Sequence, residues 1–481
     1  MAWLDADVIV VGAGPAGSAA AAHLARRGIQ VMLVDRQAFP RDKTCGDFVG
    51  PGALRELEHL GLSKLAAFRR SNRIRSGALF VDGQELITLP LPHVRGLPRF
   101  ARAIPRALLD DWIRQTAVVA GAEMRQGFRV TRLSSGLQHV TVHGVRDRRP
   151  ARLRARVVIG ADGSTSAVAR TLQSSGALAR PQIIAVRGYY NDVVGPIHRA
   201  DLYLNRQSFP GYCWVFVTER GRANVGVGML VNTIPPAESR MQDLLTHLIE
   251  SDPALRTRLR HARLDGRLVG WPLMTYDPHK PLVGERCLVI GDAAGLINPL
   301  NGEGIQHALQ SARWASAVVA HAIATKDCSA VALSAYARRV EREIRGDMAV
   351  STLLVQLIRN RNLLPFWLTG VGVIADIAKN DRQYAAIASA VLCGMLPTRY
   401  AGLLIKPTLN RLPQSLARWA TDHASREVGG LLGIVVHSLE TTLSVRERFS
   451  SHPEQLAGWY SDVDAAADEV SYHIANAHRA S

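Results

Sequence analysis

The chain has 481 residues, 47% of them hydrophobic, which predicts a folded protein of about two or three domains and excludes a disordered one. Its formal net charge of +17 is compatible with binding to nucleic acid, with binding to an anionic membrane, or with a genome that favours arginine. Since no block of adjacent basic residues and no aromatic motif of an RNA-binding sheet occurs, we expect no nucleic-acid partner. The five cysteines form no C-x-x-C and no zinc-spaced cluster, so we expect no metal site and a reducing compartment.

The first element is a β-branched run at residues 7–11, typical of a strand buried on both faces. It leads into the spacing G-x-G-x-x-G, in which Gly12 permits a tight turn, Gly14 lets a diphosphate approach the backbone, and Gly17 lets the next helix pack closely. That helix is rich in alanine and is expected to end at Gly28. The free N–H groups at its start favour a diphosphate. The pattern indicates a dinucleotide site; the alternative is a glycine-rich turn that binds nothing.

A second apolar strand follows and ends at Asp35. An acid at this position can accept hydrogen bonds from the hydroxyls of an unphosphorylated ribose, as in FAD or NAD. No second G-x-G-x-x-G occurs, so the sequence predicts no dedicated NAD(P)H domain.

Later elements alternate between nucleotide-binding and β-rich patterns. One buried strand leads into a second glycine-rich signature, GDAAGLINPLNGEGI, at residues 291–305. We expect helices at 50–70 and 105–122, strands near 123–133 and 137–146, a buried strand in 155–163, an antiparallel sheet within 182–230, a buried strand in 286–295, and mostly helices from 303 onward.

Taken together, the chain resembles the geranylgeranyl reductase family of FAD-dependent oxidoreductases, within the p-hydroxybenzoate-hydroxylase-like fold. The resemblance runs from about residue 5 to residue 400 and is greatest to actinobacterial members, which include menaquinone prenyl-chain reductases. Besides the two signatures, the segments that carry it are FPRDKTCGD (39–47), PRALLDD (105–111), GADGSTSAVAR (160–170) and PGYCWVFVTERGRANVGVG (210–228).

The expected fold is α/β, with a discontinuous Rossmann-like FAD-binding domain, an inserted antiparallel β-sheet substrate domain and a helical C-terminal region. We assign the FAD-binding domain to residues 1–75, 100–175 and 280–340, the substrate domain to 76–99 and 176–279, and the helical region to 341–481.

The resemblance implies that FAD is held by both ends of the chain. Asp292 follows a buried strand and can accept from the ribitol or diphosphate side, while the helix opened by Gly304 can point its positive N-terminus at the flavin pyrimidine edge. The predicted cofactor contacts are Gly12, Gly14, Pro15, Ala16, Gly17, Asp35, Arg36, Cys45, Gly46, Arg106, Val130, Asp162, Gly291, Asp292, Gly302, Gly304 and Ile305.

Three of these contacts have plainer alternatives. Arg106, the family's flavin-facing arginine, can pair bidentately with the diphosphate or be a solvated arginine at a helix start. Asp162 can touch FAD or hold a turn near it. Cys45 can donate a proton as a catalytic residue, or only provide a small side chain beside the flavin.

Tyr212, Trp214 and Phe216 alternate along a strand, so their side chains should share one face. Spacing alone favours a core position for such aromatics. Because they match the Y-x-W-x-F part of the family's prenyl-reductase motif, the resemblance implies an apolar wall that binds the substrate.

The implied activity is FAD-dependent saturation of C=C bonds in a polyprenyl chain of menaquinone or a geranylgeranyl lipid. The flavin delivers hydride to one carbon while a proton reaches the other in a dry, apolar site. NAD(P)H or a separate electron donor must supply the electrons. The alternatives are an FAD-dependent monooxygenase acting on an apolar small molecule and a non-catalytic flavoprotein or membrane-bound scaffold.

No signal peptide or run of 18 apolar residues is visible, so we expect a cytoplasmic protein. Basic residues outnumber acidic ones in 331–420, which also suits an interfacial helix on anionic lipid. Peripheral contact with the inner face of the membrane therefore stays open. The apolar stretches that would make this contact are 363–378, 385–396 and 429–439.

Overall fold

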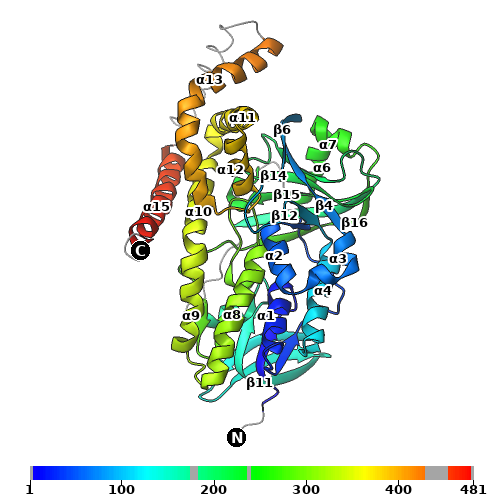
Figure 1. The fold of residues 1–481 in the computed structure, drawn as a ribbon, viewed down its shortest axis with the longest axis vertical. Coiled ribbons are helices and arrows are strands. Elements are labelled where there is room, and N and C mark those ends of the chain that lie inside the picture. Colours follow the sequence, from blue (N-terminus) through cyan, green and yellow to red (C-terminus); the bar gives the residue numbers. More distant parts are fainter. Residues whose placement is uncertain (1–3, 174–181, 236–239, 428–452, 478–481) are drawn as a thin grey trace. The chain divides into compact units, whose positions relative to one another are not determined.

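The computed structural model describes residues 4–173, 182–235, 240–427 and 453–477 (Figure 1). The chain forms two compact units, each built from separated segments. The first unit comprises Met1–Arg73, Ala101–Arg187 and Val269–Arg345, and the second comprises Ile74–Phe100, Gly188–Leu268 and Gly346–Ser481.

The first unit contains a mainly parallel sheet whose central strand is β1 (Ala6–Val11). β1 pairs in parallel with β2 (Val31–Val34) on one side and with β11 (Arg149–Gly160) on the other. Both flanking strands are apolar where they meet β1, as expected for strands buried on two faces. The order continues through β8 (Glu123–Arg125) beyond β2, and through β18 (Cys287–Val289) and β17 (Val283–Gly284) beyond β11. An antiparallel extension joins β10 (Val140–Arg146) to β11 and β9 (Phe128–Ser135) to β10.

Helix α1 (Pro15–Ala25) packs against the long helix α8 (Ile305–Thr325) in the first unit. The alanines of α1 up to Ala22 are buried, and the short side chains allow a close approach in which the Ser316 hydroxyl of α8 donates to the Ala20 carbonyl oxygen at 3.2 Å. The unit also contains α2 (Pro51–His59), α3 (Ala66–Arg70), α4 (Arg106–Val119), α5 (Ala167–Leu172), α9 (Ala330–Val340) and a small sheet of β3 (Phe48–Val49), β7 (Ala101–Ala103) and β4 (Asn72–Ile74).

The second unit is built on a mainly antiparallel sheet, in which β13 and β5 form a parallel pair. In order across the sheet, its strands are β16 (Arg263–Leu273), β12 (Ile183–Asn191), β15 (Arg222–Leu230), β14 (Tyr212–Glu219), β13 (Arg199–Leu204), β5 (Ser76–Val81) and β6 (Gln84–Pro90). The boundary between the units cuts the two outer strands, so that the end of β16 from Val269 and the start of β12 up to Arg187 belong to the first unit.

Helices of the second unit form an apolar cluster of their own. Val373 and Ile377 of α11 (Leu364–Asn380) pack with Tyr384 of α12 (Arg382–Leu392), and Leu404 of α13 (Gly402–Glu427) lies against them. The remaining helices of this unit are α6 (Met241–Ser251), α7 (Pro253–Arg258), α10 (Gly346–Ile358) and α15 (Pro453–Ala477).

The predicted fold class is confirmed: a parallel Rossmann-like sheet, a separate antiparallel sheet and helices in the C-terminal part. The single helix expected over residues 50–70 is wrong, because Gly61 adopts φ +87° and breaks it into α2, a 3₁₀ turn and α3. The predicted domain boundaries stay a prediction. The second compact unit contains both the antiparallel sheet and the helices after Gly346.

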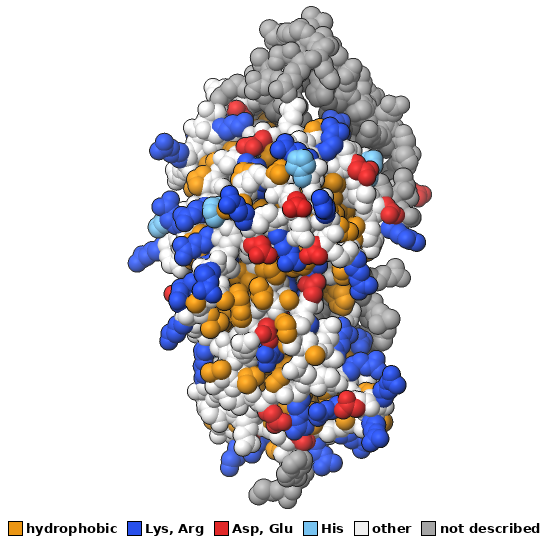
Figure 2. Space-filling view, turned by 90° about the vertical axis from the view of Figure 1, so that its right-hand side faces the viewer, with side chains coloured by type: hydrophobic (Ala, Val, Ile, Leu, Met, Phe, Trp, Pro, Cys, Tyr) orange, Lys and Arg blue, Asp and Glu red, His pale blue; other side chains and the backbone are white. Residues whose placement is uncertain are grey.

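None of the helices within the described ranges is both long and apolar enough to cross a membrane. The stretch 429–439 lies outside the described residues. Figure 2 shows Lys and Arg side chains scattered over one face, with acidic side chains between them rather than gathered in a continuous basic stripe.

Candidate cofactor site

Two positions at the turn after β1, Gly12 and Gly17, leave no room for a side chain. Gly12 has φ +98°, and a Cβ added there would lie 2.3 Å from the Ala161 carbonyl oxygen. A Cβ at Gly17 would lie 1.8 Å from the Gly12 oxygen. Both positions therefore require glycine, and the backbone of this loop stays bare where a diphosphate can approach it.

The two glycine-rich signatures meet in the fold. Gly291 adopts φ +58°, and a Cβ added there would lie 2.9 Å from the Cβ of Ala16 in the first signature. The Gly291 N–H donates to the Ser311 hydroxyl of α8 at 3.1 Å, which fixes the second loop on that helix. Segments from the beginning and from three-fifths of the way along the chain thus form one surface.

Asp35 is anchored at the end of β2. Its carboxylate accepts the N–H of Ala13 at 2.8 Å through one oxygen and the N–H of Gln37 at 2.8 Å through the other. The Asp35 carbonyl oxygen accepts from Phe128 N–H, so Val130 lies just beyond this contact on β9. Arg36 is exposed. The predicted ribose acid is thus fixed beside the first glycine loop.

Helix α8 begins without a capping side chain in the described structure. The Gly304 carbonyl oxygen accepts from Ala308 N–H at 2.8 Å, while Gly302, at φ +72°, turns the chain into the helix. A Cβ at Gly304 would lie 3.4 Å from an oxygen of Asp292. Asp292 therefore stands at the positive end of the helix dipole. Contact of Asp292, Gly304 and Ile305 with the flavin stays a prediction.

Arg106 differs from its predicted arrangement. Its Nε and one terminal nitrogen contact the two carboxylate oxygens of Asp110 at 2.6 and 2.8 Å. Burial alone would lower the pKa of Arg106, but Asp110 and Cys45 hold it well above its usual range. Because Asp110 already occupies the guanidinium fork, bidentate pairing of Arg106 with a diphosphate does not fit this geometry.

Arg41 lies beside the first glycine-rich signature. One of its terminal nitrogens lies 3.5 Å from the Cβ position of Gly14, and the other contacts Asp110 at 3.0 Å. Arg41 was not among the predicted cofactor contacts, although it lies in the segment FPRDKTCGD that carried the resemblance. Its guanidinium places a cation beside the glycine-rich turn after β1.

Cys45 and Lys43 lie on the same loop as Arg41. The Cys45 Sγ accepts the N–H of Asp47 at 3.4 Å and also interacts with Arg106. The Lys43 ammonium is 3.6 Å from an Asp292 oxygen and 5.1 Å from the centre of the Trp271 ring. Residues 39–47 therefore reach both glycine-rich signatures; Gly46, which follows Cys45, is half-buried.

Asp162 holds the turn before α5, which was the structural alternative to contact with FAD. Its carboxylate accepts the Ser166 hydroxyl and the Ala167 N–H, the latter at 2.7 Å, and so caps α5. Burial raises the pKa of Asp162, and these hydrogen bonds oppose the rise. Contact with FAD stays a prediction for this residue, whose Cα would lie only 2.9 Å from a Cβ at Gly12.

The aromatic residues of β14 do share one face of their strand. The ring centroids of Tyr212 and Trp214 are 6.1 Å apart, and those of Trp214 and Phe216 are 6.3 Å apart. Trp214 and Phe216 are buried, and the Trp214 indole N–H donates to Asn224 at 2.9 Å. This burial also fits the core alternative, and the role of a substrate wall stays a prediction.

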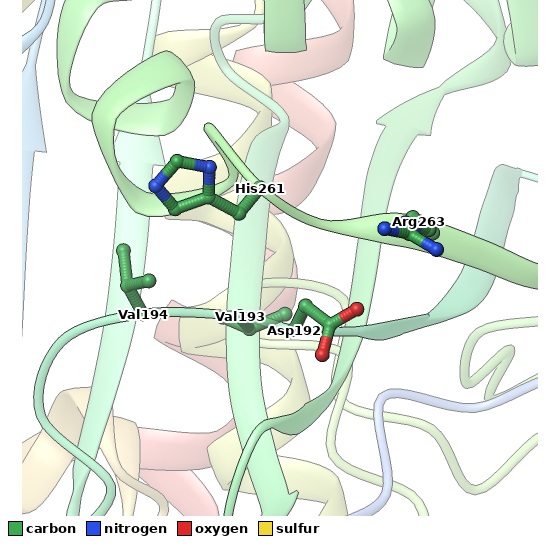
Figure 3. A pocket seen from close by; sticks show the side chains of 5 residues that line it. All are labelled: Asp192, Val193, Val194, His261 and Arg263. Atoms are coloured by element: carbon green, nitrogen blue, oxygen red, sulfur yellow. The ribbon is translucent and has the colours of Figure 1, made fainter.

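A separate open hollow of about 580 Å³ lies on the second unit. In Figure 3, Asp192, Val193 and Val194 line one side, and His261 and Arg263 come from the segment that crosses above them. None of the predicted site residues lines it.

Comparison with known proteins decides the family. A model described as an FAD binding domain matches residues 5–239. Menaquinone reductase of Mycobacterium tuberculosis is 35% identical over 333 residues, covering 65% of this chain and 76% of that protein. The chain belongs to the geranylgeranyl reductase family of FAD-dependent oxidoreductases. Digeranylgeranylglycerophospholipid reductase 2 of Methanopyrus kandleri is 29% identical over 352 residues, covering 71% of this chain and 83% of that protein.

The fold also matches solved structures. A geranylgeranyl bacteriochlorophyll reductase-like protein of Thermoplasma acidophilum superimposes with a TM-score of 0.64 at 22% identity, covering 93% of this chain and 98% of that one. A flavin-dependent brominase, Bmp2, superimposes with a TM-score of 0.67 at 18% identity, covering 84% and 99%. At these identities the likeness shows the shared fold.

As a member of this family, the chain is an FAD-dependent oxidoreductase of the prenyl reductase type, and its cofactor is FAD. The residues present fit this cofactor: the first signature leaves bare backbone for the diphosphate, a guanidinium lies at Gly14, and a fixed acid ends β2. No group of His, Cys, Asp and Glu that could hold a metal ion occurs among the residues the structure describes.

Proposed function

We propose that this protein uses FAD to saturate C=C bonds in a polyprenyl chain, such as that of menaquinone or a geranylgeranyl lipid. The meeting of Gly291 and Ala16 supports a single FAD site made by both signatures. The substrate class rests on the relatives, which are named as reductases of menaquinone and of a digeranylgeranyl lipid.

Each part of the site has a proposed partner on the coenzyme. Gly14 and the start of α1 bind the diphosphate through backbone N–H groups, and Arg41 adds a cation there. Asp35 binds ribose hydroxyls. Asp292 and the start of α8 at Ile305 face the flavin end, where the helix dipole favours negative charge.

FAD, when bound, supplies the two-electron reduction chemistry. The chain must keep the reacting carbons dry and hold one proton nearby, because an isolated C=C bond is not electrophilic. Cys45 is the proposed proton holder at its Sγ atom, which Arg106 and the Asp47 N–H orient. A water bound in the same position is the alternative source.

The shared face of Tyr212, Trp214 and Phe216 is proposed to bind the prenyl chain. Aromatic rings offer large apolar surface with few rotatable bonds, which suits a long isoprenoid. We further propose that NAD(P)H or a separate reductase supplies electrons, and that a peripheral membrane contact gives access to the lipid.

The proposal is tested by mass spectrometry of the prenyl lipids from a deletion strain. A strain lacking this protein should accumulate a lipid that is two hydrogens lighter for each bond normally reduced, and expression of the protein should restore the mass. Unchanged quinone and prenyl-lipid masses would remove the proposed substrate class.

A further inference from the structure

The loop of residues 39–47 places one cation beside each glycine-rich signature. Their order along the loop matches the proposed order of the coenzyme, with the diphosphate first and the flavin second. Arg41 reaches Gly14 at the phosphate-binding turn. Two residues later, Lys43 reaches Asp292, which stands beside Gly304 at the start of α8. The second cation therefore serves the flavin end of the proposed site.

The Lys43 ammonium is only partly satisfied. Its separation from Asp292, 3.6 Å, is an ion-pair distance and too long for a good hydrogen bond. The Trp271 ring, 5.1 Å away, adds a cation–π contact but accepts no conventional hydrogen bond. Only 19% of the Lys43 side chain is exposed, so water replaces few of the missing partners.

Burial lowers the pKa of Lys43; Asp292 opposes this shift, and the charge of Arg106 adds to it. The ion pair with Asp292 therefore does not fully compensate the desolvation of the ammonium. An additional negative charge at this place would restore part of the lost solvation.

Asp292 is also approached from a second positive element. One of its oxygens lies near Lys43, and the other lies beside Gly304, where the uncapped N-terminus of α8 begins. One carboxylate thus faces an ammonium and a helix N-terminus together. The balance of these groups favours a ligand that becomes more negative during the reaction.

We propose that Lys43 is a charge-compensating residue for the flavin, offsetting the negative charge of the reduced coenzyme and so raising its reduction potential. Trp271 and Asp292 hold the ammonium in place for this purpose. The proposal rests on the placement of the flavin at Asp292 and Gly304 under the proposed function. It assigns Lys43 to the redox equilibrium and not to the chemistry of the lipid.

The test is an anaerobic redox titration of bound FAD in the full chain, without lipid, together with the affinity for oxidised FAD. Lys43→Gln should lower the preference for reduced over oxidised FAD about tenfold, a shift of about 30 mV to more negative potential for a two-electron couple. Lys43→Arg should keep the potential near that of the unchanged protein, because the cation remains. Lys280→Gln is the matched control, since Lys280 pairs with Asp277 at the same 3.6 Å and is 20% exposed.

Asp292→Asn gives an independent reading if Lys43→Gln does not retain FAD. Removing the carboxylate leaves Lys43 unopposed, so the potential should become more positive. The proposal is overturned if Lys43→Gln moves the potential no more than Lys280→Gln, if it weakens oxidised and reduced FAD equally, or if Asp292→Asn leaves the potential unchanged or lowers it. Failure of a prenyl lipid to reoxidise the reduced protein would count against the proposed function and not against these potentials.

Discussion

A Cβ added at Gly291 would lie 2.9 Å from the Cβ of Ala16, although the two residues belong to opposite parts of the sequence. At this distance the Cα of Gly291 can carry a hydrogen atom but no side chain. The bare backbone at Gly291 is therefore a condition for the two glycine-rich loops to lie together.

Gly291→Ala should lower FAD affinity at least about tenfold and destabilise the fold by about 1–3 kcal/mol, since it adds overpacking to a left-handed backbone. Gly28→Ala is the control: its φ of +77° is also left-handed, but a Cβ there meets nothing within 4 Å. Isothermal titration with FAD and thermal unfolding separate the effects. Equal loss of FAD affinity in both variants would show that packing between the loops does not matter.

Arg41→Met should weaken FAD binding about tenfold or more while leaving riboflavin, which has no phosphates, bound as before. The reason is that the Arg41 guanidinium lies at Gly14, where the diphosphate is proposed to bind. Fluorescence titrations with both ligands measure this. A parallel loss of riboflavin affinity would instead indicate a general collapse of the loop.

Arg106→Met should act mainly on stability, by about 3–5 kcal/mol, because it removes the bidentate partner of the fully buried Asp110 carboxylate. Arg41→Met should cost less, since Arg41 makes a single contact with Asp110 at 3.0 Å. Chemical denaturation curves compare the two variants. A smaller stability loss for Arg106→Met than for Arg41→Met would contradict the assigned network.

His307, in the first turn of α8, should make stability depend on pH. Burial lowers its pKa from 6.5 to about 4, and a hydrogen bond with Gln310 opposes this shift only in part. Between these values the unfolded chain binds a proton that the folded chain does not, so stability is complete above pH 6.5 and falls by up to about 3 kcal/mol as the pH drops to about 4. His307→Gln should reduce the slope of unfolding free energy against pH over this window and leave the part contributed by His23, whose pKa burial also lowers to about 4. His321→Gln, an exposed position on the same helix, should leave the slope unchanged.

Phe216→Leu and Phe80→Leu form a matched pair in the second unit. Phe216 is 8% exposed and stacks with Trp214, while Phe80 is 7% exposed and stacks with Tyr203. Both changes should cost about 1 kcal/mol of stability. Only Phe216→Leu should also raise KM for a prenyl lipid several-fold, because it reduces the apolar surface that the proposed wall offers to the lipid. An unchanged KM would leave Phe216 as a core residue.

The glycine-rich turn after the first strand could be predicted from the sequence, because sterics at Gly12 and Gly17 allow no other residue. The partner of Arg106 could not be predicted. Asp110, four residues later on the same helix, competes with any ligand for the guanidinium, and which of them wins depends on burial that the sequence alone does not reveal. The position of Lys43 was not predicted either, because it also depends on burial. A lysine on a loop usually reaches solvent, and only the fold brings this one to Asp292.

The most direct test of the account is a single anaerobic turnover of the photoreduced protein with menaquinone or a geranylgeranyl lipid. The account predicts that the lipid reoxidises the flavin without oxygen and that the recovered lipid has gained two hydrogens. Reoxidation by oxygen alone, with a product that has gained an oxygen atom, would contradict it.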